Sequence, residues 1–229
     1  TDSTSQPFSG SLQIGGVNGG TFRSNTVVSN DAVVCGGMYL QYAGWISPTL
    51  FISNTVSENS AAWGGGLFLI YAPVSFEGNQ IVDNSASRGG GLDALSSEAL
   101  FERNTFARNA AEGEGGGVRM ETSLPTFNGN TFEQNSAGDG GGLYLWVSTA
   151  ILDGNAFLAN SAEQGGGLHL RECDGTLTNN IFAGNEATGT GSGLYLAGSA
   201  PHLLHTTVAG SHDGSGIYVT NWQSYPSSP

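Results

Sequence analysis

The sequence predicts an all-β fold, a parallel β-helix of about eight coils with a cap at each end. One observation is a unit of about 25 residues that recurs along most of the chain. A second is that each copy has too few apolar side chains to bury a core alone, so neighbouring copies must stack. A third is the length of the unit, which is too short for a propeller blade and suits one coil of a solenoid.

The first part of each unit alternates apolar residues with asparagines at fixed spacings. Phe127, Asn130, Phe132 and Asn135 show the pattern. The units start at Phe22, Phe51, Phe76, Phe101, Phe127, Leu152, Leu177 and Leu203. The last unit keeps the spacing but has Thr and Ser in place of the two asparagines. Stacked Asn side chains bond one another and the turns around them, so we interpret both Asn columns as structural.

A glycine cluster and a short apolar strand complete each unit, as in GGGLFL at residues 64–69. The last glycine of the cluster recurs at Gly66, Gly91, Gly117, Gly142, Gly167, Gly193 and Gly216, in steps of 23 to 26 residues. Glycine permits a positive φ or a close backbone approach at a corner. A phosphate-binding loop would need a following helix and a Lys, and the chain has no Lys.

One repeat type predicts a single elongated domain rather than two globular ones. We expect a linker and cap at residues 1–21, the β-helix at 22–219, and a C-terminal cap and linker at 220–229. Phe8, Leu12 and Ile14 are expected to cover the first coil, and Trp222 and Tyr225 the last one.

A longer connection lies around residues 45–50, where Gly37 and Gly66 are 29 residues apart. Extra length in a solenoid is accommodated in a surface loop, which is a plausible contact point. Trp45 in this loop is either packed against the cap or exposed.

The alternation of FxxN and GGxL carries a family resemblance. FEGN at residues 76–79, FERN at 101–104 and FNGN at 127–130 resemble the repeats of chlamydial polymorphic outer membrane proteins and of bacterial right-handed β-helix surface proteins. The likeness covers roughly residues 22–219, with Gly where the chlamydial repeats usually have Ala. It implies a right-handed parallel β-helix, as crossover chirality also favours. It also implies secretion, an extracellular or cell-surface location, and an adhesive or surface-structural role.

Composition excludes several partners. The formal net charge is −13, from 6 basic and 19 acidic residues, which argues against nucleic acid and anionic membrane surfaces. The charged fraction of 11% and the 37 Gly suit a secreted solenoid. No apolar run approaches the length of a membrane span, so this segment is not expected to insert into a membrane.

The two cysteines are predicted to be free within one chain. Cys35 and Cys173 are five coils apart, roughly 24 Å at the spacing of stacked strands. A disulfide requires Cα atoms within about 7 Å.

The strand after each glycine cluster offers the candidate site. Alternation directs Leu143 and Leu145 inward and Tyr144 and Trp146 outward. The first outward column is Tyr39, Phe68, Asp93, Arg119, Tyr144, His169, Tyr195 and Tyr218. The second is Gln41, Ile70, Leu95, Glu121, Trp146, Arg171, Ala197 and Thr220. The candidate ligand-binding residues are Arg119, Glu121, Tyr144, Trp146, His169, Arg171 and Tyr195.

This face has three interpretations. It is an ordinary solenoid surface, because aromatic residues suit strands. Alternatively it binds carbohydrate, with aromatic rings stacking on sugars and the charged groups bonding hydroxyls or carboxylates, or it binds a protein on a host or neighbouring cell. The third interpretation is catalysis, which we consider less favoured.

Catalysis would follow the polysaccharide lyases that this fold resembles. Arg119 would neutralise a uronate, with His169 and Tyr144 as base and acid. There is no Lys, no evident calcium-binding carboxylate cluster and no long loop to form a cleft. A glycoside hydrolase would use Asp93 and Glu121, but a neighbouring Arg119 is expected to lower the pKa of Asp93, the wrong direction for a general acid.

Metal and assembly sites are the remaining possibilities. Glu114 and Asp139 precede the glycine corners of neighbouring coils and could hold calcium, or they are solvated. No other cofactor is expected. His202, His205 and His212 are interpreted as surface residues rather than a zinc site. Incompletely capped ends could also stack head to tail into fibres.

Overall fold

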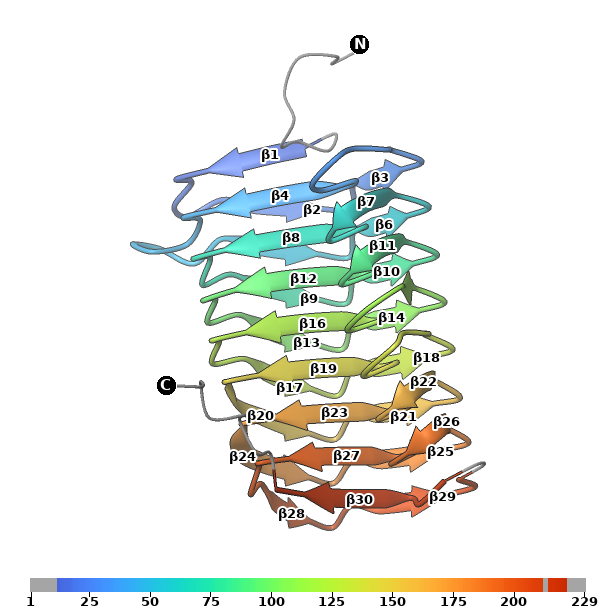
Figure 1. Cartoon of the computed structure of the whole chain (residues 1–229). Helices are drawn as coiled ribbons and strands as arrows, with labels where there is room; N and C mark the ends of the chain where they lie inside the picture. Colours follow the sequence, from blue (N-terminus) through green and yellow to red (C-terminus); the bar gives the residue numbers. More distant parts are fainter. Residues whose placement is uncertain (1–11, 212–213, 222–229) are drawn as a thin grey trace, which may run out of the picture.

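The computed structural model describes residues 12–211 and 214–221, which wind into a stack of parallel strands (Figure 1). The predicted all-β solenoid is confirmed, because every strand pair is parallel and joins one coil to the next. The strands form four walls, called sheets A to D below. Short turns at the corners of each coil connect them.

Sheet A has nine strands and contains the strand after each glycine cluster. Its strands are β1 (Leu12–Gly15), β4 (Met38–Gln41), β8 (Leu67–Ile70), β12 (Leu92–Leu95), β16 (Val118–Glu121), β19 (Leu143–Trp146), β23 (Leu168–Arg171), β27 (Leu194–Ala197) and β30 (Ile217–Thr220).

Sheets B and C have eight strands each and carry the repeated Phe residues. Sheet B consists of β2 (Thr21–Arg23), β5 (Leu50–Ile52), β9 (Ser75–Glu77), β13 (Leu100–Glu102), β17 (Thr126–Asn128), β20 (Thr149–Asp153), β24 (Asp174–Thr178) and β28 (His202–Leu204). Sheet C consists of β3 (Thr26–Val28), β6 (Thr55–Ser57), β10 (Gln80–Val82), β14 (Thr105–Ala107), β18 (Thr131–Glu133), β21 (Ala156–Leu158), β25 (Ile181–Ala183) and β29 (Thr207–Ala209).

Sheet D is short and interrupted, and it lies beside the start of the sheet A strands (Figure 1). Its strands are β7 (Ser60–Trp63), β11 (Ser85–Arg88), β15 (Ala110–Ala111), β22 (Ser161–Gln164) and β26 (Glu186–Thr190). Bridges through Ser136 connect its two parts.

The core consists of columns of identical side chains inside the stack. In sheet B the rings of Phe76, Phe101 and Phe127 stack with centroids 5.3 and 4.6 Å apart. In sheet C the rings of Phe132 and Phe157 lie 4.6 Å apart and nearly parallel. Burying one Phe contributes about 2 kcal/mol, and a stacked pair adds about 1 kcal/mol. The apolar spacing therefore predicts the same strand register that places these Phe rings on top of one another in the core.

The Asn columns are structural, as predicted. The Asn130 side chain donates to the carbonyl of Phe101 at 2.9 Å and to Asn155 Oδ1 at 3.0 Å. Its Oδ1 accepts from the backbone N–H and the side-chain amide of Asn104. All hydrogen-bonding groups of a fully buried amide are thus satisfied by the adjacent coils. The residue before each Asn has a positive φ or is glycine, as at Arg103 (φ 52°), which turns the chain.

The glycine corner is a place of close backbone contact. A Cβ on Gly65 would lie 2.4 Å from the carbonyl oxygen of Ser85 and 2.5 Å from that of Gly90. No side chain fits at these distances, so stacking itself requires glycine here.

A third ladder was not predicted from the sequence. Ser97, Ser123, Ser148 and Cys173 follow the sheet A strands, and each receives a hydrogen bond from the backbone N–H of the preceding coil. Cys173 therefore takes the place of a serine. Cys173 and Cys35 are both buried and free, in agreement with the predicted separation. Burial raises the pKa of their thiols to about 11 and about 12.

The ends of the chain are described only in part. Leu12–Gly15 is the edge strand of sheet A, and Ile14 is buried in the main core. Phe8, His212, Trp222 and Tyr225 lie outside the described residues, so the predicted caps stay predictions.

Candidate functional site

The first outward column of sheet A is buried from Tyr39 to His169, which corrects the expectation of an open aromatic strip, while Tyr195 is partly exposed and Tyr218 exposed. Its side chains point away from the main core, as alternation predicts. However, in three successive coils the residue before the glycine corner lies against the residue five positions later: Trp63 contacts Phe68, Arg88 contacts Asp93 and Glu114 contacts Arg119. The column is thus enclosed between sheet A and the segment leading to the corner.

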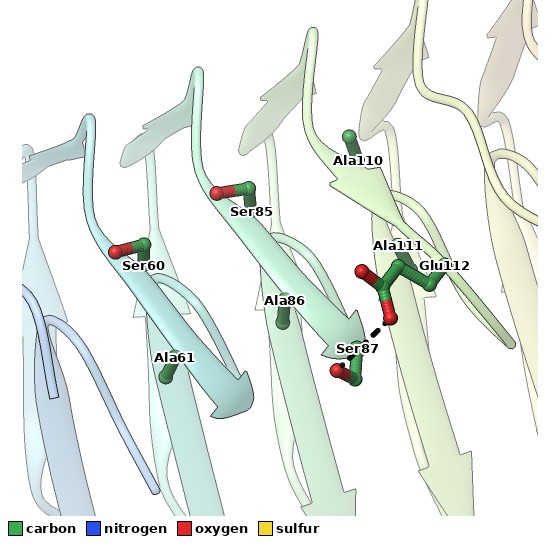
Figure 2. A pocket seen from close by; sticks show the side chains of 8 residues that line it. All are labelled: Ser60, Ala61, Ser85, Ala86, Ser87, Ala110, Ala111 and Glu112. Carbon is green, nitrogen blue, oxygen red and sulfur yellow. Dashed lines mark hydrogen bonds between the residues drawn. The ribbon is translucent and has the colours of Figure 1, made fainter. Parts of the chain in front are cut away.

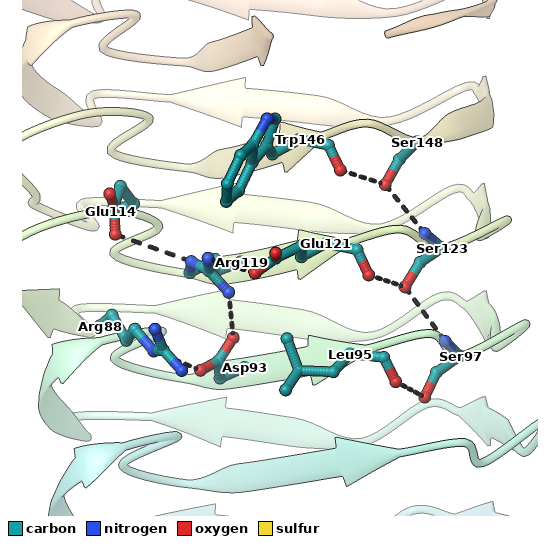
Figure 3. Close-up of polar contacts among 10 residues, drawn as sticks. All are labelled: Arg88, Asp93, Leu95, Ser97, Glu114, Arg119, Glu121, Ser123, Trp146 and Ser148. Atoms are coloured by element: carbon teal, nitrogen blue, oxygen red, sulfur yellow. Dashed lines mark hydrogen bonds and ion pairs between the residues drawn. The ribbon is translucent and has the colours of Figure 1, made fainter. Parts of the chain in front are cut away.

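Arg119 is the centre of a buried ion-pair network (Figure 3). Its Nη1 donates to Asp93 Oδ1 at 3.0 Å and its Nη2 to Glu121 Oε2 at 2.8 Å, while Nε lies 3.6 Å from Glu114 Oε2. Arg88 donates to the other oxygen of Asp93 at 3.1 Å. The side chains of Arg119 and Asp93 are 3% and 0% exposed. Arg119 is therefore occupied within the protein.

The pKa of Asp93 differs from the expectation. Burial raises it, and this effect exceeds the lowering by Arg119 and Arg88. The expected ion pair with Arg119 is present and does lower the pKa, but the expected net direction was wrong, because nothing in the residue pattern indicated that the carboxyl is fully enclosed. Such a carboxyl has no access to a leaving group, so it remains unsuited to general acid catalysis.

His169 and Tyr144 are enclosed in a stack of rings. The His169 ring lies 4.8 Å from the Tyr144 ring and 4.6 Å from the Tyr195 ring. Burial, together with Arg171, lowers the pKa of His169 to about 3, so it is neutral at physiological pH. Burial also raises the pKa of Tyr144. The three candidate catalytic side chains are therefore inaccessible, and only Tyr195 among these rings is partly exposed.

Asp139 lies next to this stack. Its carboxylate is 3.9 Å from His169 Nδ1, which is buried without a hydrogen-bond partner in the described part of the chain. Burial, with Glu114 and Glu163, raises the pKa of Asp139 to about 6. Glu114 and Asp139 pair across adjacent coils as predicted for the calcium candidate. Within residues 12–211 and 214–221, however, no three acidic, His or Cys side chains gather as a metal site.

The second outward column, apart from Ala197, remains partly exposed, and its middle residues Glu121, Trp146 and Arg171 are called the accessible strip. The Arg171 guanidinium lies 5.1 Å from the Trp146 ring centroid, a cation–π contact. The Glu121 side chain is 28% exposed. Three of the seven candidate residues thus lie together on one surface, whereas Arg119, Tyr144 and His169 lie beneath it.

A shallow depression of about 200 Å³ adjoins this strip. It is lined by Ile70, Tyr71, Leu95, Ser96, Glu121 and Thr122. Exposed aromatic residues that were not among the candidates lie at its end, namely Tyr42, Trp45 and Tyr71. Trp45 is 61% exposed, in agreement with the second of its two alternatives. The sequence feature that indicated an exposed Trp45 was the longer connection around residues 45–50.

A second depression, of about 310 Å³, lies over sheet D (Figure 2). It is lined by Ser60, Ala61, Ser85, Ala86, Ser87, Ala110, Ala111 and Glu112. Ser87 donates to Glu112 at 3.3 Å, and the other lining residues are small. Small side chains let the short strands stack closely, and no group there indicates chemistry.

Comparison with known proteins identifies the family. The model of the right-handed β-helix region matches residues 74–228, about two thirds of the chain. The chain belongs to the right-handed β-helix family. This confirms the handedness and the fold expected for the β-helix. No curated protein matches the sequence.

Among solved structures, the β-helix is similar to a trypsin-treated variant of QnrB1, a plasmid-mediated fluoroquinolone resistance protein. The two are 14% identical, the match covers 82% of this chain and 91% of that chain, and the TM-score is 0.23. In the described residues, no helix has the length and apolarity needed to cross a membrane.

Proposed function

We propose that this β-helix is a recognition module without catalytic activity, acting outside the cell as a surface-structural or adhesive element that binds carbohydrate. The observation that carries the proposal is the separation of the candidate residues into two layers. Arg119, Tyr144 and His169 are each at most 4% exposed, while Trp146 and Arg171 remain partly exposed above them. The accessible strip offers an aromatic ring with charged groups beside it, and few groups for chemistry.

Burial weakens the enzyme alternative. A general acid or base must come within hydrogen-bond reach of the substrate, and a neutralising Arg needs a free guanidinium. Arg119 instead bonds Asp93 and Glu121. His169, with a pKa of about 3, is packed between two tyrosine rings. The lyase mechanism would require both residues to leave these positions.

The resemblance of the FxxN and GGxL repeats to chlamydial polymorphic outer membrane proteins supports the adhesive role and the extracellular or cell-surface location. The net charge of −13 favours an uncharged or mixed partner over nucleic acid. Rigid stacking suits such a role, because ordered side chains lose little freedom on binding.

Incubation with neutral and uronate polysaccharides, followed by size-exclusion chromatography, tests the proposal. We expect chains of unchanged length that co-elute with the protein, and at least tenfold weaker binding after Trp146→Ala. Trp63→Ala is the matched control, because Trp63 is 40% exposed and also stacks on an arginine, Arg88, but belongs to sheet D. Shortened chains would establish an enzyme, and unbound chains would direct the search to cell-surface proteins.

End-to-end assembly is a second candidate, favoured by the last coil. Val219 and Ile217 of β30 are 64% and 43% exposed, and β30 pairs on one side only among the described strands. An unpaired edge can accept another strand. Sedimentation velocity at increasing concentration would reveal such stacking, and a constant monomer would exclude it.

A further inference from the structure

The corner between sheets A and B carries an exposed aromatic group in the first coils. We call it the aromatic corner and define it as Tyr42, Trp45, Ile46 and Tyr71. Their exposed fractions are 51%, 61%, 85% and 44%. Trp45 and Ile46 belong to the loop between β4 and β5, which projects from the stack (Figure 1).

Hydrogen bonds and stacking hold the aromatic corner in place. The rings of Tyr42 and Tyr71 stack with centroids 5.5 Å apart and an interplanar angle of 3°. Trp45 Nε1 donates to the carbonyl of Tyr71 at 2.6 Å, and the N–H of Ile46 donates to Asn18 Oδ1 at 2.8 Å. The rings are thus ordered before any ligand arrives, which lowers the entropy cost of binding.

The fold does not require aromatic residues at this corner. Tyr42 and Tyr71 have φ values of 53° and 48°, and the equivalent residues of other coils have the same conformation. Those residues are Ser96, Thr122, Val147, Glu172 and Gly198. A tyrosine at this corner lies on the surface rather than in the core and adds exposed apolar area, so packing of the coils does not explain its presence.

The segments that build the aromatic corner carry no charge, and Glu121, which lines the adjoining depression, is ion-paired with Arg119 at 2.8 Å. The three segments, residues 12–22, 32–57 and 59–76, contain no Asp, Glu, Lys or Arg, although the chain has a net charge of −13. Hydroxyl groups of Ser96 and Thr122 line the adjoining depression beside Tyr71. Aromatic faces with nearby hydroxyls, beside a carboxylate that is already paired with Arg119, suit an uncharged ligand that has both apolar faces and hydroxyl groups.

We infer that the aromatic corner is a binding site for an uncharged saccharide, with sugar rings stacked on Trp45 and Tyr71 and the chain continuing into the depression. This inference rests on the proposed carbohydrate recognition and adds the ligand class and a site separate from Trp146. A protein partner fits less well, because a stable protein interface takes about 20 residues a side and the aromatic corner offers four.

Isothermal titration calorimetry with uncharged oligosaccharides and a uronate oligosaccharide of equal length tests the inference. The uncharged probes are β-linked glucose, N-acetylglucosamine and mannose oligomers. We expect at least one to bind, with at least a tenfold higher Kd in Trp45→Ala and in Tyr71→Ser, which introduces the residue of the next coil at this corner. Trp63→Ala should bind as the wild type does, and thermal unfolding by circular dichroism establishes that all variants fold.

Several results would overturn the inference. If uncharged saccharide binds and only Trp146→Ala weakens it, the aromatic corner is not the site, while the proposed function stands. If only the uronate binds, the ligand class is wrong. If no saccharide binds the wild type, this inference and carbohydrate recognition both fail. If the wild type binds no saccharide, and Trp45→Ala abolishes its self-association or its binding to another protein, the aromatic corner is a site for a protein partner instead.

Discussion

Replacing Arg119 by Met tests whether this residue holds the fold or is available to a ligand. Methionine keeps most of the apolar stem and removes the guanidinium. Asp93 then retains Arg88 as its one charged partner, at 3.1 Å, while its side chain is 0% exposed and cannot be hydrated. Glu114 and Glu121 also lose a partner, but their side chains are 40% and 28% exposed.

The expected loss of stability depends on whether each partner of Arg119 is buried or partly exposed. Breaking a buried ion pair destabilises by about 3–5 kcal/mol, because one charge stays enclosed without compensation. Partly exposed carboxylates regain water, so each contributes about 1 kcal/mol or less. Since Arg88 still holds Asp93, we expect Arg119→Met to lower the free energy of unfolding by about 3–4 kcal/mol.

A double variant isolates the charge from the packing. Asp93→Leu combined with Arg119→Met makes the first outward column apolar between Phe68 and Tyr144, so most of the lost stability should return. Urea unfolding followed by far-UV circular dichroism measures both variants at pH 7. A loss below about 1 kcal/mol in the single variant, or a double variant no more stable than the single, would refute the structural role and return Arg119 to the ligand candidates.

Two further stability predictions follow from the ladders and the ring stack. Asn130→Ala should lower the free energy of unfolding by about 3 kcal/mol, because it leaves two donors of Asn104 and the carbonyl of Phe101 unpaired. The control Asn25→Ala, in the exposed first coil, should lower it by less than about 1 kcal/mol. Equal urea midpoints for the two variants would contradict this prediction. His169 has a folded pKa of about 3 against 6.5 when unfolded, so its stabilisation is complete above pH 6.5 and declines as the pH falls towards 3. His169→Phe, which preserves ring stacking, should therefore lose less stability between pH 7 and pH 4 than the wild type, and parallel pH profiles of the urea midpoints would contradict this.

The fold could be predicted because its determinants are local and repeated. Phe at one position of successive units stacks on the same Phe of the next coil, so a spacing read along the chain becomes a contact in space. The same holds for Asn130 and its neighbours, whose bonds run to the equivalent Asn. The Ser ladder escaped prediction because Cys173 and the alanines at its start interrupt the pattern.

The candidate site was predicted less well because alternation gives direction and not exposure. Tyr144 does point away from the main core, yet it is 2% exposed. What covers this column is the residue before each glycine corner, and that residue changes from Trp63 to Arg88 to Glu114 along the chain. Its partner five positions later changes with it, to Phe68, Asp93 and Arg119. The sequence already contained this match, because these residues, five positions apart, are either both apolar or oppositely charged.

Departures from the repeat are the better guide to recognition in this solenoid. A residue that recurs in every coil has a partner above and below it, so its chemistry is used within the stack. Trp45 has no equivalent in later coils, because the connection that contains it is longer than the others. It lies exposed beside Tyr71, at a corner where later coils have no aromatic residue. Stacking of the coils does not account for such a group, so the aromatic corner is where a partner should be sought before the charged middle of sheet A.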